Sequence, residues 1–236
     1  MITIQQLAKG FSVNGDTLSI LDIPNWHVEK GSKIAIIGPS GSGKSTLLHL
    51  IGGILKAEKG QIHVDGVKLH ELTESQRDQF RSQHIGYILQ DFHLIPSLTA
   101  RQNAEIVMNP SLSRKERAAE LDHWFEQVGL KDRMQHRPSQ LSRGQQQRVA
   151  IIRALINRPS IVLADEPTGS LDWETAGEIT DILLSEPVSK FATLLTVTHD
   201  LNLAQRFPIR LHIQEINKAF KTKQDENLPT HKERAV

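Results

Sequence analysis

The chain has 236 residues, enough for one or two domains that bury a hydrophobic core without disulfides or structural metals. It contains no cysteine, which excludes a disulfide scaffold, a thiol nucleophile and a cysteine-ligated metal centre. Lysine and arginine total 28 against 27 aspartate and glutamate residues, and this net charge of +1 leads us to expect no nucleic-acid partner.

The first third of the sequence predicts short strands, tight turns and one helix. Ile2–Leu7 alternates apolar and polar residues, and Asn14-Gly15-Asp16 predicts a hairpin turn. Lys33–Ile37 predicts a buried strand that runs into a glycine-rich loop, and Thr46–Leu55 predicts a helix. A second hairpin turn is predicted at Asp65-Gly66, between strands over 61–64 and 67–69.

The middle of the chain predicts helices. Capping boxes, in which a serine or threonine precedes a glutamine or glutamate by three positions, are expected at Thr99 with Gln102, at Ser113 with Glu116 and at Ser142 with Gln145. Trp124 follows helical spacing and is expected in the core. Another helical stripe runs from residue 149 to residue 156, before Pro159.

Two unbroken apolar runs, Ile161–Ala164 and Thr193–Val197, predict strands that are buried on both faces, as in a parallel α/β sheet. The sequence therefore predicts an α/β core over 1–90 and 159–216, interrupted by a helical subdomain over 91–158. Residues 217–236 are polar and charged, and we expect them to form a mobile surface tail.

No run of apolar residues approaches the roughly 20 that a membrane span requires. The N-terminus also lacks the basic region and apolar stretch of a secretory signal. We therefore expect the protein to remain in the cytoplasm, where it is made. Any work at a membrane would need another chain to supply the membrane segment.

The strongest motif is Gly-Pro-Ser-Gly-Ser-Gly-Lys-Ser at 38–45, which fits G-x-x-x-x-G-K-[ST] between a strand and a helix. Its glycines let backbone N–H groups converge on phosphate oxygens, and the helix N-terminus favours the same anion. Lys44 would neutralise the β- and γ-phosphates, and Ser45 would bind Mg²⁺. The expected nucleotide contacts are Gly38, Pro39, Ser40, Gly41, Ser42, Gly43, Lys44, Ser45 and Thr46. The motif alone does not distinguish ATP from GTP, or a kinase from a hydrolase.

The apolar run at 161–164 ends in two carboxylates, Asp165 and Glu166. Ligands of open α/β sheets bind at the carboxyl ends of the strands, so both acids are expected beside the phosphate loop. Asp165 would hold Mg²⁺, directly or through water, and Glu166 would accept a proton from the attacking water. Successive strand residues point to opposite sides, so the two acids can have different roles.

The segment Leu141-Ser142-Arg143-Gly144-Gln145 resembles the LSGGQ signature of ABC-type ATPases, and further motifs of that family follow in order along nearly the whole chain. The resemblance makes 38–46 the Walker A loop, 161–166 the Walker B strand and 170–172 the D-loop. It implies a P-loop NTPase (RecA-like) core with an N-terminal antiparallel β subdomain and an inserted α-helical subdomain.

The same resemblance assigns roles to residues that spacing alone does not. Phe11 would stack on adenine. Gln90 would be the Q-loop glutamine, which touches Mg²⁺ and the attacking water, and His199 would bridge that water and the γ-phosphate. Ser142, Gly144 and Gln145 would contact ATP bound to a second subunit, so that two chains enclose two nucleotides head to tail.

Residues 92–99, 137–140 and 164–169 are similar to the lipoprotein-release and macrolide-exporter (LolD/MacB-like) group of that family. This similarity implies an ATP-hydrolysing transporter subunit that uses Mg²⁺, pairs with a second ATPase subunit and docks on membrane-spanning permease subunits at the cytoplasmic face of the inner membrane. The cargo, and whether it is exported or imported, are not indicated. The apolar stretch formed by Phe92, Leu94, Ile95 and Pro96 is expected either to line the docking groove or to be core.

Two alternatives stay open. The first is a soluble ABC ATPase that acts on ribosomes or DNA, although such proteins usually carry two ATPase units and this chain has one phosphate loop. The second is a regulatory subunit that binds ATP without turnover, because Arg143 replaces the first glycine of the signature. If that glycine serves for space or for a positive φ angle, arginine would weaken the site.

Overall fold

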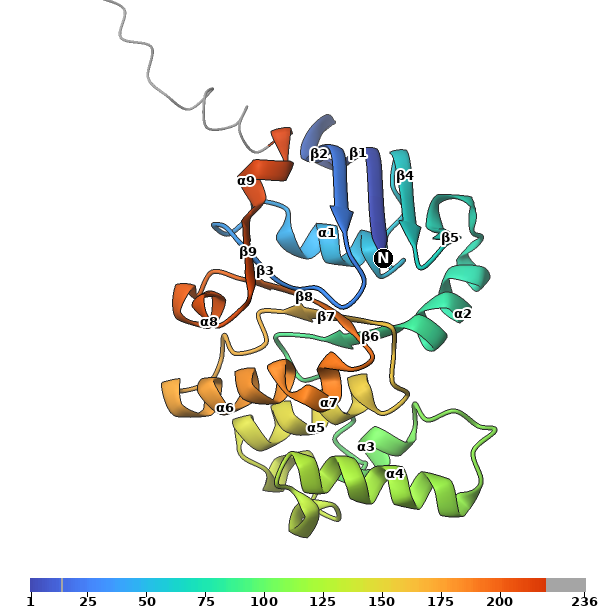
Figure 1. The fold of residues 1–236 in the computed structure, drawn as a ribbon, viewed down its shortest axis with the longest axis vertical. Helices are drawn as coiled ribbons and strands as arrows, with labels where there is room; N and C mark the ends of the chain where they lie inside the picture. The colour runs from blue at the N-terminus through green and yellow to red at the C-terminus, as the bar shows by residue number, and fades with distance from the viewer. Residues whose placement is uncertain (14, 220–236) are drawn as a thin grey trace, which may run out of the picture.

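The computed structural model describes residues 1–13 and 15–219. Figure 1 shows two stacked sheets with a helix between them and most of the other helices beyond the second sheet. This arrangement is the predicted α/β fold, with an antiparallel β subdomain above a parallel sheet.

The first sheet is antiparallel and has the strand order β2-β1-β4-β5. Its strands are β1 (Ile2–Val13), β2 (Asp16–Val28), β4 (Lys59–Val64) and β5 (Val67–Lys68). Val13 pairs with Asp16 and Val64 pairs with Val67, so chain reversals lie where the two hairpin turns are predicted. Asn14 of the first turn lies outside the described residues.

The second sheet is parallel and has the strand order β6-β7-β8-β3-β9. Its strands are β3 (Lys33–Ile37), β6 (Ile85–Ile88), β7 (Ile161–Asp165), β8 (Thr193–Thr198) and β9 (Ile209–His212). The three predicted apolar strands, β3, β7 and β8, are adjacent at the centre. Because all five strands run the same way, their carboxyl ends meet at one edge, where a ligand of such a sheet binds.

Residues along the central strands alternate between two hydrophobic clusters. Ile34 and Ile36 of β3 face the antiparallel sheet and helix α1 (Lys44–Ile51), whereas Ala35 and Ile37 face the helices on the other side. This alternation explains why the strands carry no polar residues facing solvent. The predicted helix over 46–55 is too long, because α1 ends at Ile51 and Gly53 adopts a left-handed conformation with φ 68°.

The remaining helices are confirmed where capping boxes predict them. Thr99 caps α3 (Ala100–Glu105), Ser113 caps α4 (Arg114–Gln127) and Ser142 caps α5 (Arg143–Leu155), each with its reciprocal side-chain partner. Trp124 is buried, as expected. The other helices are α2 (Glu74–His84), α6 (Trp173–Leu184), α7 (Glu186–Ser189), α8 (Leu201–Gln205) and α9 (Ile213–Ile216), with single 3₁₀ turns at 69–71, 131–133 and 138–140.

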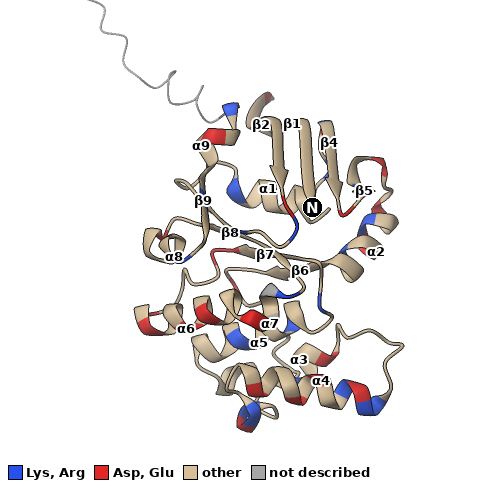
Figure 2. Cartoon of the chain, in the orientation of Figure 1, with Lys and Arg blue, Asp and Glu red and all other residues tan. Residues whose placement is uncertain are grey.

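Charged residues of both signs are interspersed over the described chain, and α4 carries both (Figure 2). Within this part of the chain, no helix is both long and apolar enough to cross a membrane.

Asn217, the first residue of the expected surface tail, is buried instead, and residues 220–236 of that tail lie outside the described residues. Its side chain is fully buried. Asn217 Nδ2 donates to the carbonyl oxygens of Ile20 (2.9 Å) and Ser42 (3.2 Å), and its Oδ1 accepts from the N–H groups of Asp22 (2.9 Å) and Ala219 (3.2 Å). One amide therefore joins β2, the phosphate loop and the segment after α9.

Replacing Asn217 by alanine should lower the free energy of unfolding by about 3 kcal/mol, because it leaves buried backbone groups without partners. Urea unfolding measures the change. Asn202→Ala, at an exposed asparagine, is the control and should leave the midpoint almost unchanged. Equal midpoints for the two variants would contradict a structural role for the buried amide.

Candidate nucleotide-binding and catalytic site

The phosphate loop begins at the carboxyl end of β3 and ends at Gly43, the N-cap of α1. Gly43 has φ 95°, a conformation that side chains disfavour, and a Cβ atom there would lie 2.7 Å from Leu21 Cδ2 and 3.1 Å from the carbonyl oxygen of Ile20. The motif glycine is therefore required both for its backbone angle and for its close approach to β2. The first N–H groups of α1 face the cavity that this loop lines.

Lys44 lies across this loop. Its ammonium group donates to the carbonyl oxygens of Gly38 (2.7 Å) and Pro39 (3.0 Å). Burial lowers the pKa of Lys44, and the nearby carboxylates Glu166 and Asp165 partly oppose that effect. A phosphate group would supply the negative charge that this buried cation needs.

Ser45 and Asp165 meet across the cavity. The Ser45 hydroxyl donates to Asp165 Oδ1 at 3.0 Å, so the two residues predicted to bind Mg²⁺ lie side by side. Burial raises the pKa of the Asp165 carboxyl, while the Ser45 hydrogen bond acts in the opposite direction. A desolvated carboxylate of this kind is stabilised by a bound cation.

Glu166 and His199 form the second pair. His199 Nδ1 lies 2.8 Å from Glu166 Oε1, and the Thr198 hydroxyl donates to Glu166 Oε2 at 3.0 Å. Glu166 itself has φ 46°, an uncommon left-handed angle for a residue with a side chain. The carboxylate is thus held in one orientation by β8 and the loop after it. Thr198, which orients Glu166, is a site residue that no sequence motif indicated.

A cavity of about 380 Å³ brings most of the predicted site together. It is lined by Phe11, Ile20, Ser40, Gly41, Gly43, Lys44, Ser45, Thr46, Gln90, Asp165, Glu166 and His199. Phe11 is 41% exposed, and the ammonium nitrogen of Lys9 lies 5.1 Å from the centre of its ring. Ile20 of β2 was missed, because only the pairing of β2 with β1 brings it there. Gly38, Pro39 and Ser42 belong to the loop but do not line the cavity.

The predicted signature residues lie apart from this cavity, at the N-terminus of α5. Ser142 is exposed, and its hydroxyl and backbone N–H exchange hydrogen bonds with Gln145 in a capping box. Gly144 is buried, and a Cβ atom there would lie 2.4 Å from Thr175 Cγ2 of α6. Within one chain, therefore, the signature does not contact the nucleotide cavity.

Arg143, which replaces the first signature glycine, has an ordinary helical backbone as the first residue of α5. Its φ angle is not positive. A left-handed angle is therefore not required at this position, and the exposed side chain causes no close contact of the kind that would arise at Gly144.

The donor set at this edge fits magnesium. Ser45 and Asp165 offer hard oxygen ligands, and Gln90 lines the same cavity. Over residues 1–13 and 15–219, no three His, Cys, Asp or Glu side chains gather into a metal-binding group. In proteins Mg²⁺ is usually held by one or two carboxylates together with phosphates and water.

Together the parallel sheet, the glycine-rich phosphate loop and the acidic strand end define a P-loop nucleoside triphosphatase. Comparison with known proteins is more specific. The ABC transporter family profile matches residues 21–169. The lipoprotein-releasing system ATP-binding protein LolD of Legionella pneumophila (strain Lens) is 42% identical over 216 residues, which cover 91% of this chain and 95% of LolD.

A second curated protein and a solved structure point to the same family. The uncharacterized ABC transporter ATP-binding protein YbbA of Escherichia coli (strain K12) is 42% identical over 210 residues, covering 87% of this chain and 91% of YbbA. A dimeric structure of the ATP-binding cassette MJ0796, in a post-hydrolysis state bound to ADP and Pi, matches with a TM-score of 0.82 and 35% identity over 90% of this chain and 94% of that one.

The chain belongs to the ATP-binding proteins of ABC transporters, and it is a LolD/YbbA-like member of that family. It is an ABC-type ATPase whose reaction is coupled to transport.

Replacing Asp165 by asparagine should raise the melting temperature of the magnesium-free protein by a few degrees. Burial raises the pKa of this carboxyl in the folded state, so the unfolded chain releases the proton more readily. The ionised carboxyl therefore destabilises the folded state, and this effect grows as pH rises through the folded pKa. Thermal unfolding without Mg²⁺ should show a larger gain for the variant at about pH 7 than at about pH 4. Asp132→Asn, at an exposed aspartate, should show no such trend. A gain independent of pH would contradict this explanation.

Proposed function

We propose that the chain is the ATP-hydrolysing subunit of an export complex, in which two copies close on two Mg²⁺–ATP molecules and thereby move permease subunits. The observation that carries this proposal is the cavity in which the phosphate loop, Asp165, Glu166 and His199 meet. The family membership supports it, because relatives of similar length carry the names of transporter ATP-binding proteins.

Each side chain of the cavity has a distinct task. Lys44 and the backbone of 38–46 hold the phosphates, and Phe11 offers its ring to the base. Ser45, Asp165 and Gln90 would hold Mg²⁺, which neutralises charge on the β- and γ-phosphates when bound. Glu166 is the general base, positioned by Thr198 and His199 to take a proton from the attacking water.

A second copy would complete the site. The N-terminal end of α5, where Ser142 forms its capping box, lies on the surface and does not line the cavity of its own chain. A helix N-terminus favours an anion. The exposed Ser142, with Gly144 and Gln145 beside it, would therefore meet the γ-phosphate bound by a partner subunit, and the dimeric MJ0796 structures support such pairing.

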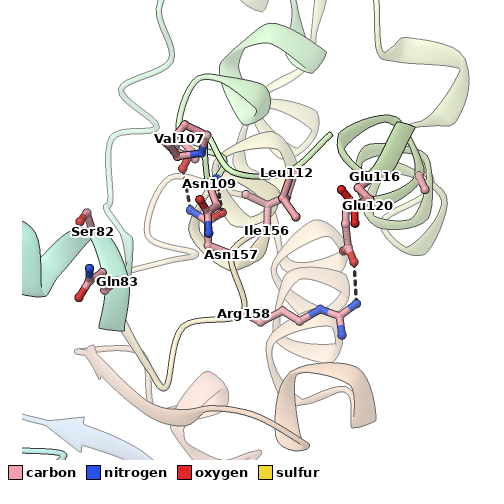
Figure 3. Close-up of a pocket in the computed structure, with 12 residues that line it drawn as sticks. Ser82, Gln83, Val107, Asn109, Leu112, Glu116, Glu120, Ile156, Asn157 and Arg158 are labelled. Atoms are coloured by element: carbon pink, nitrogen blue, oxygen red, sulfur yellow. Dashed lines mark hydrogen bonds and ion pairs between the residues drawn. The ribbon is translucent and has the colours of Figure 1, made fainter. Parts of the chain in front are cut away.

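The permease subunits would dock in a groove on the side of the molecule. Two clefts, of about 900 and 600 Å³, share Ser82, Val107 and Asn157 and together form what we term the lateral groove. Figure 3 shows the larger cleft. On one side of it Arg158 pairs with Glu120, and on the other Asn157 Nδ2 donates to the carbonyl oxygen of Val107. The groove shares no lining residue with the nucleotide cavity.

Exposed apolar residues support this use of the lateral groove. Ile54, Ile106 and Val107 line it and are 46%, 60% and 41% exposed. Such apolar surface beside charged residues is typical of a protein interface. We place the protein at the cytoplasmic face of the inner membrane, held there by these permease contacts.

The apolar stretch after Gln90 remains a second candidate for permease contact. Ile95 and Pro96 are exposed, while Phe92 and Leu94 are half-buried and Leu94 packs against the helical core. The four residues are not all enclosed, so the docking interpretation survives. None of them lines the lateral groove, however, and the sequence did not single out the groove residues.

Replacing Glu166 by glutamine should lower ATP hydrolysis by about 10²- to 10⁴-fold, because the general base is lost while the phosphate contacts remain. Steady-state turnover and equilibrium ATP binding are measured on the same preparation. Binding should be retained. Glu186→Gln, at an exposed glutamate on α7, is the control. Unchanged turnover in Glu166→Gln would rule out the assigned base.

Replacing Val107 by aspartate should weaken binding to co-expressed permease subunits about tenfold or more, because a buried charge without a partner is costly. Co-purification from detergent measures the loss, and ATP turnover of the isolated chain verifies folding. Ile209→Asp places the same charge at an exposed isoleucine on β9, outside the groove. Equal co-purification of both variants would remove the lateral groove as the docking site.

A further inference from the structure

We propose that Arg143 is a positioning residue that ties the N-terminus of α5 to the segment after Gln90, through the ring of Phe92. The consequence is that a displacement of Gln90 by nucleotide is transmitted to the signature residues. The inference rests on the proposed roles of Gln90 and Ser142 and deepens them, because it names the contact that couples the two.

The contact itself is direct. The Arg143 guanidinium carbon lies 5.5 Å from the centre of the Phe92 ring. A guanidinium over an aromatic face within about 6 Å is attracted by the ring quadrupole. Phe92 is two positions from Gln90, and Arg143 directly follows Ser142. The pair therefore spans the distance between the two elements that would contact the two nucleotides of a dimer.

A second arginine of the same helix fixes the same segment. Arg153 donates to the carbonyl oxygens of Phe92 (2.8 Å) and His93 (2.7 Å). His93 adopts a left-handed backbone with φ 44°, which persists in a side-chain-bearing residue only where its surroundings hold it. Arg153 thus anchors the backbone of this segment two to three helical turns from the N-terminal end of α5.

Arg143 adds what Arg153 cannot supply, a contact at the signature end of the helix. Without a side chain at position 143, the hydrogen bonds from α5 to the backbone of this segment would still come from Arg153, in the third turn of the helix. The two glycines of the LSGGQ pattern cannot make this ring contact. A larger residue at position 144 could not make the contact either, because its side chain would clash with Thr175. We therefore interpret Arg143 as a residue that adds a contact, and not as a substitution that impairs the signature.

A double-mutant cycle tests the link. The variants are Arg143→Gly, Phe92→Leu and the double variant, and kcat and KM for ATP are measured for each. An exposed cation–π contact corresponds to an effect of about two- to fivefold. We expect each single variant to lower kcat by about that factor, and the double variant to be no slower than the worse single one.

The controls separate coupling from folding and from helix propensity. Arg114→Gly makes the same exchange at the first residue of α4, after an equivalent serine capping box, and should leave kcat unchanged. Arg143→Lys and Phe92→Tyr keep a cation and a ring and should restore at least half of the lost rate. Melting temperatures of all variants verify that each is folded.

Three results would overturn the inference: multiplicative effects in the double variant, a slow Arg143→Gly beside a normal Phe92→Leu, or a faster Arg143→Gly. The second would mean that the arginine acts on a ligand and not on Phe92. The third would mean that arginine impairs the signature. Failure of the proposed catalytic site is distinguished by Glu166→Gln, whose turnover does not depend on the outcome of the cycle.

Discussion

The close approach of the phosphate loop to β2 and to the segment after α9 is the constraint on which the site depends. Gly43 leaves no room for a side chain against Leu21 and Ile20. Asn217 then fixes the carbonyl oxygen of Ser42 from behind. Glycine alone does not make a loop rigid, because glycine residues are flexible. A loop that presents several N–H groups to an anion therefore needs contacts that hold it in place. The external contacts provide the rigidity that binding requires.

Helix α5 is the second organising element, because one helix contacts several motifs. Gly144 packs against Thr175 of α6, and the buried amide of Gln147 donates to the carbonyl oxygen of Pro167, directly after Glu166. Arg153 holds the segment after Gln90. The signature helix is thereby connected within its own chain to both the acidic strand end and the Q-loop segment. Discrete, well-packed contacts of this kind favour rigid-body movement over local yielding.

What could be predicted from the sequence was local. The phosphate loop, the three apolar strands and the capping boxes of α3, α4 and α5 depend on neighbours within a few positions, and each is present. The same capping-box pattern at Thr73 and Gln76 begins α2, a helix that was not predicted although its signal was available. The end of α1 was misplaced because apolar residues continue past the two glycines that terminate it.

The missed features depend on residues far apart in the sequence. Thr198 orients Glu166 from 32 positions away, and Asn217 reaches Ser42 across 175 positions. Strand β9 is an edge strand of four residues, and its place in the sheet was visible only through pairing with β3. The lateral groove is formed by the ends of separate helices, so no single stretch of sequence describes it.

The buried Asn217 amide has a practical corollary for handling the protein. Asn217 connects the segment after α9 to the phosphate loop, because its Nδ2 donates to the Ser42 carbonyl oxygen and its Oδ1 accepts from the N–H group of Ala219. A truncation or an insertion within 217–219, made for instance to trim the protein for crystallisation, would therefore loosen the loop that holds the phosphates. An extension at Met1 would have a different effect, because it removes the ammonium group that pairs with Asp65 at 2.7 Å.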